Sequence, residues 1–143
     1  MVTADRILAT FSSLGLRSTA QRGAIADWLS LASTGGRDFS AEEAWRELSA
    51  GDRPIGRATV FRALDALESD GLVDRIELAD GSRRYRVCGG NEHHHHIVCV
   101  ACGRVADVRS CLSPQFAGQI ASETGFTLER HSIELFGRCD GCQ

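Results

Sequence analysis

The sequence predicts an α+β protein with two parts, an N-terminal winged-helix domain and a small C-terminal α/β domain that holds a structural four-cysteine zinc site. Three observations lead to this fold class. Four stretches with helical spacing of apolar residues precede two short alternating runs. Two C-x-x-C pairs follow in the last third of the chain. Residues 1–87 carry 12 of the 16 arginines and no cysteine or histidine, so the anion-binding and metal-binding residue types are separated.

The composition excludes several classes of protein. Of the 143 residues, 43% are hydrophobic and 24% are charged, which is ordinary for a folded chain and excludes a disordered or low-complexity polymer. No stretch approaches the roughly 18 apolar residues that a membrane span needs, and no apolar signal core follows the N-terminus, so we expect a cytoplasmic protein. The formal net charge of -3 means that binding to DNA would need a local cluster of arginines.

The first three predicted helices each have a recognisable boundary. Apolar residues at helical spacing predict a helix over residues 4–14, which Gly15 ends. Thr19 offers an N-cap for a second helix that runs to about residue 31. Ser40 and Glu43 have the spacing of a capping box, which opens a third helix that ends by residue 51.

A fourth helix, from residue 56 to residue 70, is followed by a β-hairpin. Val60, Ala63, Leu64 and Leu67 form the buried stripe of the helix. Residues 72–78 and 82–87 alternate in polarity and are joined by an Ala-Asp-Gly turn. Helices followed by a hairpin predict a winged helix, in which the fourth helix would enter the major groove of DNA.

The candidate DNA contacts lie on the outer face of the fourth helix and at the start of the second. At the start of the second helix, the helix dipole favours phosphate. Ordinary surface charge is the alternative interpretation for each arginine. The candidate residues are Arg17, Arg22, Arg57, Thr59, Phe61 and Arg62.

The two C-x-x-C pairs predict a structural zinc site. Two intervening residues let both thiolates of a pair reach one tetrahedral ion at about 2.3 Å. A redox pair of the thioredoxin kind would not need a second C-x-x-C. Because 36 residues separate the pairs, a folded segment must bring them together. The predicted ligands are Cys99, Cys102, Cys139 and Cys142.

A run of four histidines precedes a β-branched run that predicts a strand. Because successive side chains of a strand face opposite ways, His93 and His95 share one face while His94 and His96 share the other. One tetrapeptide can therefore serve two metal sites. His131 lies in a run, residues 129–133, that alternates like a strand, and it could join His93 and His95; a lone histidine on the surface is the alternative.

The face with His94 and His96 could form a second metal site together with Cys88. Cys88 with two imidazoles gives a mixed sulfur and nitrogen set suited to Zn²⁺, which one carboxylate would complete. Asp74 is the candidate carboxylate, and Asp107 and Asp38 are alternatives. Cys111 is interpreted as a small apolar filler. The set is Asp74, Cys88, His94 and His96.

Taken together, the motifs resemble a known family. The predicted winged helix is followed by His-His-His-His-x-x-Cys-x-x-Cys-Gly and then by His-Ser-x-Glu-x-x-Gly-x-Cys-x-x-Cys. Residues 56–64 read Gly-Arg-Ala-Thr-Val-Phe-Arg-Ala-Leu. Over nearly its whole length the chain resembles the ferric uptake regulator family, and within that family it is most similar to the zinc uptake regulators.

The resemblance implies a homodimer with a DNA-binding domain over residues 1–84, a hinge over 85–92, and a dimerisation and metal-binding domain over 93–143. It implies that the four cysteines of the C-x-x-C pairs hold structural zinc and that the set containing Cys88 is a hinge site that senses zinc. It also implies that His93, His95 and His131 are three ligands of a further site.

The sequence departs from the family pattern at three places. Pro114, with Gln115 beside it, stands where the further site usually has Glu, which leaves its fourth ligand to water or another side chain. Phe61 replaces a usual Tyr, and Asp38 stands where iron and peroxide sensors often have His.

The expected function is a zinc-responsive dimeric repressor that binds operator DNA when its hinge site is loaded and controls zinc-uptake genes, with no membrane partner and no small-molecule substrate beyond metal ions. An iron, nickel, manganese or peroxide sensor of the same family is the main alternative. A zinc enzyme such as a nucleobase deaminase needs His-x-Glu, and no histidine upstream of Cys99 has Glu two residues later, so we do not expect an enzyme. A zinc storage or chaperone module would not need a winged helix.

Overall fold

The computed structural model of the protein describes residues 1–89 and 93–143, which fall into two compact units. The first unit takes in residues 1–77 and 82–91, and the second takes in residues 78–81 and 92–143. Of the predicted hinge over 85–92, residues 90–92 lie outside the described residues. A search of the described helices finds none with the length and apolar character needed to cross a membrane.

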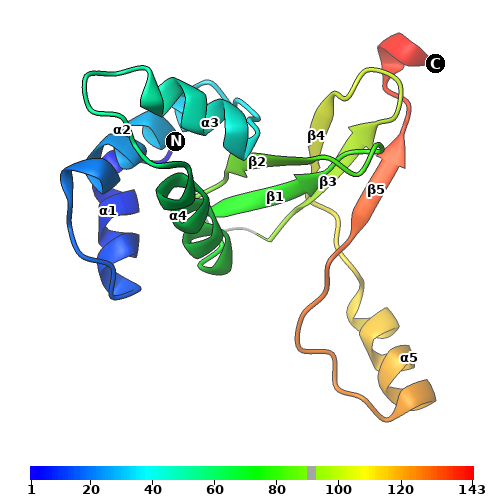
Figure 1. The fold of residues 1–143 in the computed structure, drawn as a ribbon. Coiled ribbons are helices and arrows are strands. Elements are labelled where there is room, and N and C mark those ends of the chain that lie inside the picture. The colour runs from blue at the N-terminus through cyan, green and yellow to red at the C-terminus, as the bar shows by residue number, and fades with distance from the viewer. Residues whose placement is uncertain (90–92) are drawn as a thin grey trace. The chain divides into compact units, whose positions relative to one another are not determined.

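The first unit is a winged helix, as the sequence predicts. Its helices are α1 (Ala4–Ser13), α2 (Ala20–Thr34), α3 (Ala41–Ser49) and α4 (Arg57–Ser69). Strands β1 (Val73–Glu77) and β2 (Arg83–Val87) then pair antiparallel (Figure 1). The predicted end of the second helix, near residue 31, falls three residues short, because the helix continues to its C-cap Gly35 and carries Leu31 on its solvent side at 75% exposure.

Side-chain caps explain where three of these helices begin. The hydroxyls of Thr3, Thr19 and Ser40 each accept a hydrogen bond from the backbone N–H three residues later. At Ser40 the capping box is complete, because the Glu43 carboxylate also accepts from the Ser40 N–H at 2.9 Å. Gly56 precedes α4 and provides no such side-chain bond.

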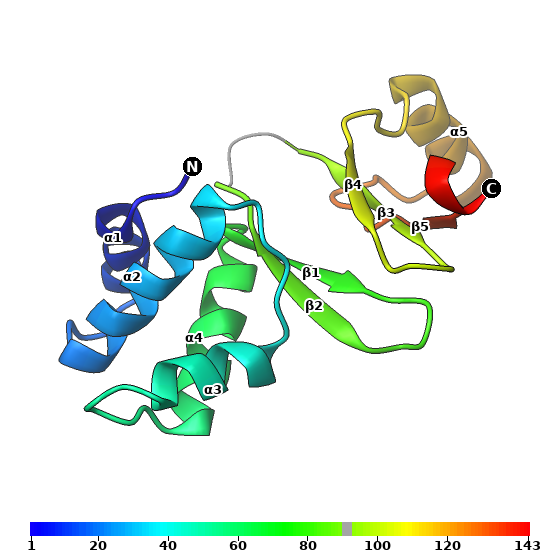
Figure 2. The same ribbon diagram turned by 90° about the horizontal axis from the view of Figure 1, so that it is seen from above.

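A single apolar core holds the helices against the hairpin. Ile7, Phe11, Leu29, Leu64 and Leu67 are all nearly inaccessible to solvent, and the predicted buried stripe of α4 is confirmed. The four helices gather at one end of the hairpin (Figure 2). A bridge from the segment before α3 extends the hairpin, because Phe39 and Tyr85 exchange both backbone hydrogen bonds, at 3.0 and 2.7 Å. This bridge fixes the wing relative to α3.

The second unit contains a three-stranded sheet and one helix. In chain order it consists of β3 (His95–Cys99), β4 (Val105–Val108), α5 (Pro114–Thr124), β5 (Glu134–Gly137) and the 3₁₀ turn η1 (Asp140–Cys142). The sheet order is β4-β3-β5, with β3 antiparallel to β4 and parallel to β5. The predicted strand over residues 129–133 is wrong, because β5 begins only at Glu134 and His131 lies in the connection before it.

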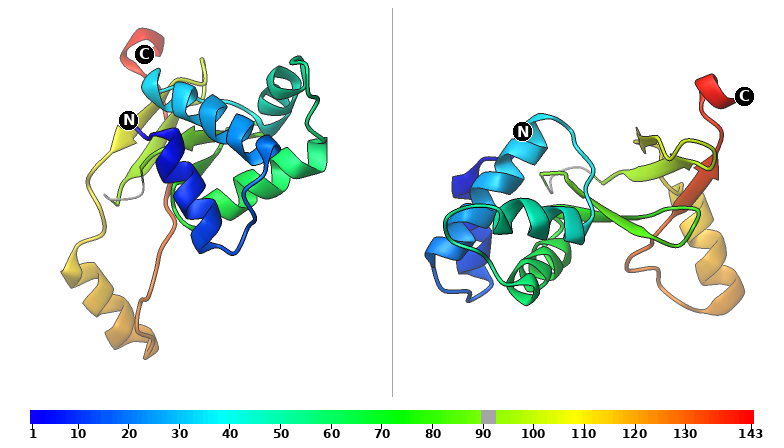
Figure 3. Two further views of the ribbon diagram at one scale, coloured as in Figure 1. Left: turned by 90° about the vertical axis from the view of Figure 1, so that its left-hand side faces the viewer. Right: turned by 45° about the horizontal axis from the view of Figure 1, so that its top comes forward.

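Few side chains of the second unit are buried. Among its described residues, His95, Val98 and Cys99 are, whereas α5 buries none. Helix α5 lies beyond the sheet, at the end of two extended segments (Figures 1 and 3). Phe116 and Phe126, in and just after α5, are 46% and 74% exposed. Hydrophobic burial within one copy is therefore too small to stabilise this unit without metal ions or a second chain.

Candidate metal centres and nucleic-acid interface

Parallel pairing of β3 and β5 brings the two C-x-x-C pairs together. Cys99 is the last residue of β3 and pairs with Gly137, the last residue of β5. The Val100 N–H donates to the Gly137 carbonyl at 2.8 Å, so the register holds beyond the strand ends. Since the carboxyl ends of parallel strands meet at one edge of a sheet, Cys139 follows β5 at the edge where Cys102 follows β3. The chain between the two C-x-x-C pairs is therefore folded so that this strand pairing brings them together, as the 36-residue separation requires.

The four thiols have the spacing of a tetrahedral zinc site. The ligand atoms of Cys99, Cys102, Cys139 and Cys142 all lie within 4.8 Å of one another. The Cys102 and Cys139 Sγ atoms are 3.7 Å apart. Four thiolates at about 2.3 Å from one Zn²⁺ would be about 3.8 Å apart along each edge. The cluster therefore fits zinc closely.

Backbone N–H groups lower the pKa of the first thiol of this cluster. The Cys139 N–H points at the Cys99 Sγ, 3.4 Å away, and together with the N–H groups of Cys102 and Ala101 it lowers the pKa of Cys99 to about 6. The pKa of Cys142 is raised to about 12, because its thiol bonds to Cys139 and then to Cys102. Four adjacent thiols cannot all ionise alone, and a divalent cation would supply the balancing charge.

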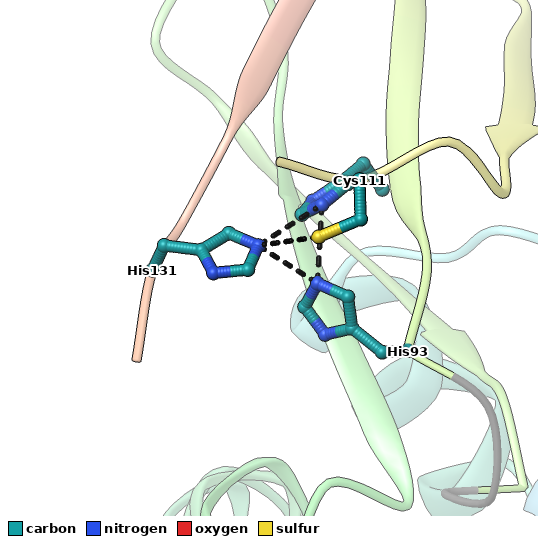
Figure 4. A group of neighbouring side chains, drawn as sticks. His93, Cys111 and His131 are labelled. Carbon is teal, nitrogen blue, oxygen red and sulfur yellow. Dashed lines mark hydrogen bonds between the residues drawn. The ribbon is translucent and has the colours of Figure 1, made fainter. Parts of the chain in front are cut away.

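A second donor group forms between β3, the segment after β4 and the segment before β5. The Nε2 atoms of His93, His95 and His131 lie 2.8 to 3.2 Å from one another. The Cys111 Sγ is 3.1 Å from the His131 Nε2 (Figure 4). Burial, followed by the neighbouring imidazoles of His93 and His131, lowers the pKa of His95. This favours the neutral imidazole, which is the form that binds metals.

The interpretation of Cys111 as an apolar filler is wrong. Its side chain is exposed, and its sulfur contacts an imidazole rather than a hydrophobic core. Pro114 is the first residue of α5, and Ser113 caps that helix, so Pro114 begins a helix and provides no side-chain ligand. No spacing rule in the sequence connects Cys111 to His131.

Asp74 and Cys88 form a pair in the first unit. Asp74 lies on β1 opposite Arg86, and the Cys88 N–H donates to the Leu72 carbonyl at 3.0 Å, which places Cys88 directly beyond the paired end of β2. The Asp74 carboxylate and the Cys88 Sγ lie within 4.8 Å of each other. The two strands of the hairpin thus offer one oxygen donor and one sulfur donor at the same end of the wing.

His94 and His96 form a pair in the second unit. They lie on the face of the histidine run opposite His93 and His95, and their ring centroids are 4.9 Å apart. The His96 Nδ1 is 3.1 Å from an Asp107 carboxylate oxygen on the paired strand β4. Such a bond orients the ring and leaves Nε2 as the metal-binding atom. Asp107 is therefore placed to support a histidine ligand.

Asp38 is engaged elsewhere in the first unit. Its carboxylate accepts from the Arg86 Nε at 2.5 Å, and both side chains are largely buried. This ion pair keeps Asp38 out of the donor groups found among the described residues.

The outer face of α4 is the candidate nucleic-acid interface. Arg62 and Ala58 are exposed, whereas Thr59 and Phe61 are half-buried. The Arg57 guanidinium bonds to the Glu42 carboxylate of α3 and lies over the Phe61 ring, 4.4 Å from its centroid. The Glu42 partner could not be predicted from the sequence, since a contact between α3 and α4 has no local sequence signal.

The other two candidate arginines lie at the start of α2. The Arg22 guanidinium donates to the Arg17 carbonyl, and the backbone N–H of Arg22 donates to Thr19 Oγ1 at 3.2 Å. The Arg17 side chain is exposed. A phosphate at this helix terminus would contact the exposed Arg17 guanidinium and the Arg22 guanidinium, which is already hydrogen-bonded to the backbone.

Comparison with known sequences supports the resemblance. The model of the ferric uptake regulator family matches residues 13–136. The zinc uptake regulation protein of Mycobacterium tuberculosis is 39% identical over 134 residues, which cover 92% of this chain and 98% of that protein. The ferric uptake regulation protein of Cupriavidus metallidurans is 35% identical over 136 residues, which cover 94% of this chain and 93% of that protein.

Solved structures share the fold. A zinc uptake regulator complexed with zinc and DNA superposes with a TM-score of 0.67 and 25% sequence identity, covering 99% of this chain and 95% of that one. The similarity extends over both units.

Proposed function

Since the chain belongs to the ferric uptake regulator family, whose members are regulators rather than enzymes, we propose that it is a zinc-responsive repressor that binds operator DNA as a homodimer and controls zinc-uptake genes. The observation that carries the choice of zinc is the Cys88 thiol beside the Asp74 carboxylate. Sulfur donors select zinc over the harder ions, which favour sites of nitrogen and oxygen. The similarity to a zinc uptake regulation protein and to a regulator complexed with zinc and DNA supports the same choice.

We assign three ligand sets within this proposal. The two C-x-x-C pairs hold structural zinc, which contributes directly to the folding of the second unit. The pair Asp74 and Cys88 and the pair His94 and His96 hold the regulatory zinc. His93, His95 and His131 belong to a further site.

The regulatory set explains how zinc would alter DNA binding. Two of its ligands belong to the DNA-binding residues 1–84 and the hinge 85–92, and two belong to residues 93–143, which we assign to dimerisation. When bound, zinc would link the DNA-binding residues to the residues that we assign to dimerisation. A preference of ~10²-fold for the DNA-binding arrangement would be worth ~2.7 kcal/mol of coupling per site.

The chain's own residues would make the DNA contacts and the dimer. The exposed face of α4 presents Arg62 to base edges, and Arg17 and Arg57 are placed to meet phosphates. The exposed aromatic side chains of the second unit suit burial against a second copy. Such a repressor acts in the compartment that holds the DNA, so a cytoplasmic location is part of the proposal.

A sensor of another metal is the competing proposal. The 35% identity to a ferric uptake regulation protein shows that overall similarity does not discriminate strongly between metals. The metal that a site prefers depends on its donor atoms, and the Cys88 thiol favours zinc over iron or manganese.

Operator binding by the purified full-length dimer, titrated separately with zinc, iron, nickel and manganese, tests the proposal. We expect zinc to raise operator affinity by ~10²-fold in the wild type. Cys88→Ser should remain a folded dimer with structural zinc but lose nearly all of this gain. Asp74→Asn should likewise lose most of the gain, and its control is Asp70→Asn, because Asp70 is an exposed carboxylate outside the donor groups and its substitution should leave the gain intact. A full zinc response in Cys88→Ser would contradict the hinge-site assignment.

A further inference from the structure

We infer that Cys111 is the fourth ligand of a metal site formed with His93, His95 and His131, and that this site takes a borderline-soft divalent ion such as Zn²⁺. The site lies wholly in the second unit. The inference therefore does not rest on the proposed repressor function.

The distances between the four donor atoms are close to those of a tetrahedral site. Three nitrogen ligands at about 2.0–2.1 Å from Zn²⁺ are about 3.3 Å apart, and a nitrogen and a sulfur ligand are about 3.6 Å apart. The three Nε2 to Nε2 distances are 2.8, 3.1 and 3.2 Å. The Cys111 Sγ is 3.1 Å from the His131 Nε2. Shifts of a few tenths of an ångström would fit the group around one ion.

Hydrogen bonding alone does not explain why these atoms converge. A neutral imidazole carries one N–H, and that N–H points along the plane of its own ring. Three Nε2 atoms that all face one another, with a thiol on the same side, form more contacts than well-aligned N–H groups can satisfy. Protonated imidazoles at these distances would repel one another. A cation at the centre satisfies all four donors together.

The thiol determines which metals the site prefers. Pro114 begins α5 and offers no donor atom in its side chain, whereas the Cys111 Sγ lies within 4.8 Å of the ligand atoms of all three histidines. A thiolate among the donors disfavours Mn²⁺ and Mg²⁺ and favours Zn²⁺ or Co²⁺. Three imidazoles and one thiolate form a closed four-coordinate set, which is typical of a site that holds its metal rather than one that performs chemistry.

The placement of the ligands gives the site a structural consequence. Cys111 precedes α5 and His131 follows it; the Cys111 Sγ contacts His131, whose Nε2 in turn contacts His93 and His95 (Figure 4). A bound ion would therefore close the segment between residues 111 and 131 onto the sheet. Since α5 buries none of its residues, this closure would anchor a helix that the core of its own unit does not hold.

Alkylation of Cys111 tests the assignment on the full-length protein. Iodoacetamide should modify Cys111 at least tenfold more slowly after Zn²⁺ is added, as measured by mass spectrometry of the Cys111 peptide. His131→Ala and His93→Ala should each abolish this protection. Ser132→Ala is the control, because Ser132 is the exposed neighbour of His131, lies outside the donor groups among the described residues and should leave the protection of Cys111 unchanged. Equal alkylation rates with and without Zn²⁺ in the wild type would overturn the inference.

Cobalt spectroscopy provides an independent readout. In Cys88→Ser with zinc retained at the four-cysteine cluster, added Co²⁺ should give a thiolate-to-cobalt charge-transfer band in the near ultraviolet. The same band should be absent from the double variant Cys88→Ser/Cys111→Ser. A band of equal intensity in both proteins would show that Cys111 is not a ligand. Neither measurement involves DNA, so its failure is distinct from failure of the repressor proposal.

Discussion

The side chain of Arg57 is held by two neighbours before any nucleic acid arrives. Its Nε donates to the Glu42 carboxylate at 2.8 Å, and its guanidinium lies over the Phe61 ring. The Arg57 hydrogen bond lowers the pKa of Glu42, so this carboxylate is charged at neutral pH and competes with phosphate for the same cation. The Phe61 ring holds the Arg57 guanidinium by a cation–π contact.

Glu42→Gln should therefore strengthen operator binding. The substitution removes the competing negative charge, and because exposed ion pairs contribute little, we expect a gain of about two- to fivefold in affinity at low salt. Fluorescence anisotropy with a labelled operator would measure it. Arg57→Ala should weaken binding and should abolish the benefit of Glu42→Gln in the double variant. An unchanged affinity in Glu42→Gln would show that Arg57 does not contact phosphate.

Arg62→Ala should abolish specific operator binding without changing zinc content. Arg62 is exposed on the outer face of α4, whose buried stripe lies on the opposite side. Loss of a base-reading arginine costs about 1–3 kcal/mol and removes discrimination between sequences. Footprinting on operator and on random DNA would measure both effects. Arg109→Ala, which removes the same charge from an exposed position in the second unit, is the control, and an unchanged footprint for Arg62→Ala would exclude α4 as the recognition helix.

Helix α3 shows how a local cap is coupled to the wing. The Glu43 carboxylate accepts from the Ser40 N–H and also from the Arg84 guanidinium of β2, at 3.2 and 3.3 Å. The Arg84 guanidinium in turn donates to the Asp38 carbonyl at 2.7 Å. One carboxylate thus completes the start of a helix and ties that helix to the hairpin.

This arrangement predicts an acid-sensitive contribution to the stability of the first unit. The Ser40 N–H, and then Arg84, lower the folded-state pKa of Glu43, so its stabilisation is present above the unfolded pKa and is lost as pH falls through the folded value. Glu43→Gln retains an acceptor for Ser40 but loses the charge. We expect it to be less stable than the wild type by about 0.5–1 kcal/mol at pH 7 and equally stable at acid pH.

Urea unfolding monitored by tryptophan fluorescence would measure this difference, because both tryptophans, Trp28 and Trp45, lie in the first unit. Glu77→Gln, an exposed glutamate at the end of β1, is the control. A stability difference that does not change with pH would show that the Glu43 charge is not involved.

At the scale of the whole molecule, the two units depend on different sources of stability. The first has a continuous apolar core of helices and hairpin. The second buries little among its described residues and instead contains two groups of four side chains that we propose as metal ligands. These are Cys99, Cys102, Cys139 and Cys142, and His93, His95, Cys111 and His131. Structural zinc sites contribute apparent free energies of ~10–16 kcal/mol, enough to replace a core.

Cys139→Ser should therefore unfold the second unit and spare the first. We expect the variant to lose one zinc ion per chain and to sediment as a monomer, while the tryptophan fluorescence and urea midpoint of the first unit change little. Metal analysis and sedimentation velocity would measure the first two effects. Cys88→Ser, a cysteine outside this cluster, should remain dimeric and keep its structural zinc. A dimeric Cys139→Ser protein with full zinc content would refute the structural role.

The sequence by itself determined the features that depend on near neighbours in the chain. The capping box at Ser40 and Glu43, the buried stripe of α4 and the two faces of the histidine run follow from fixed periods and spacings, and the structure has each of them. The two C-x-x-C pairs likewise predicted a shared ion, because that chemistry accepts few other arrangements.

Only the tertiary structure decided which distant residues meet. Parallel pairing of β3 with β5 closes the gap between the C-x-x-C pairs. The irregular segments around α5 bring Cys111 to His131. The packing of α3 against α4 brings the Glu42 carboxylate to Arg57. Contacts of this kind depend on register and on loop paths, which have no repeating pattern in the chain. For that reason a cysteine that reads as apolar filler in the sequence became a candidate metal ligand in the fold.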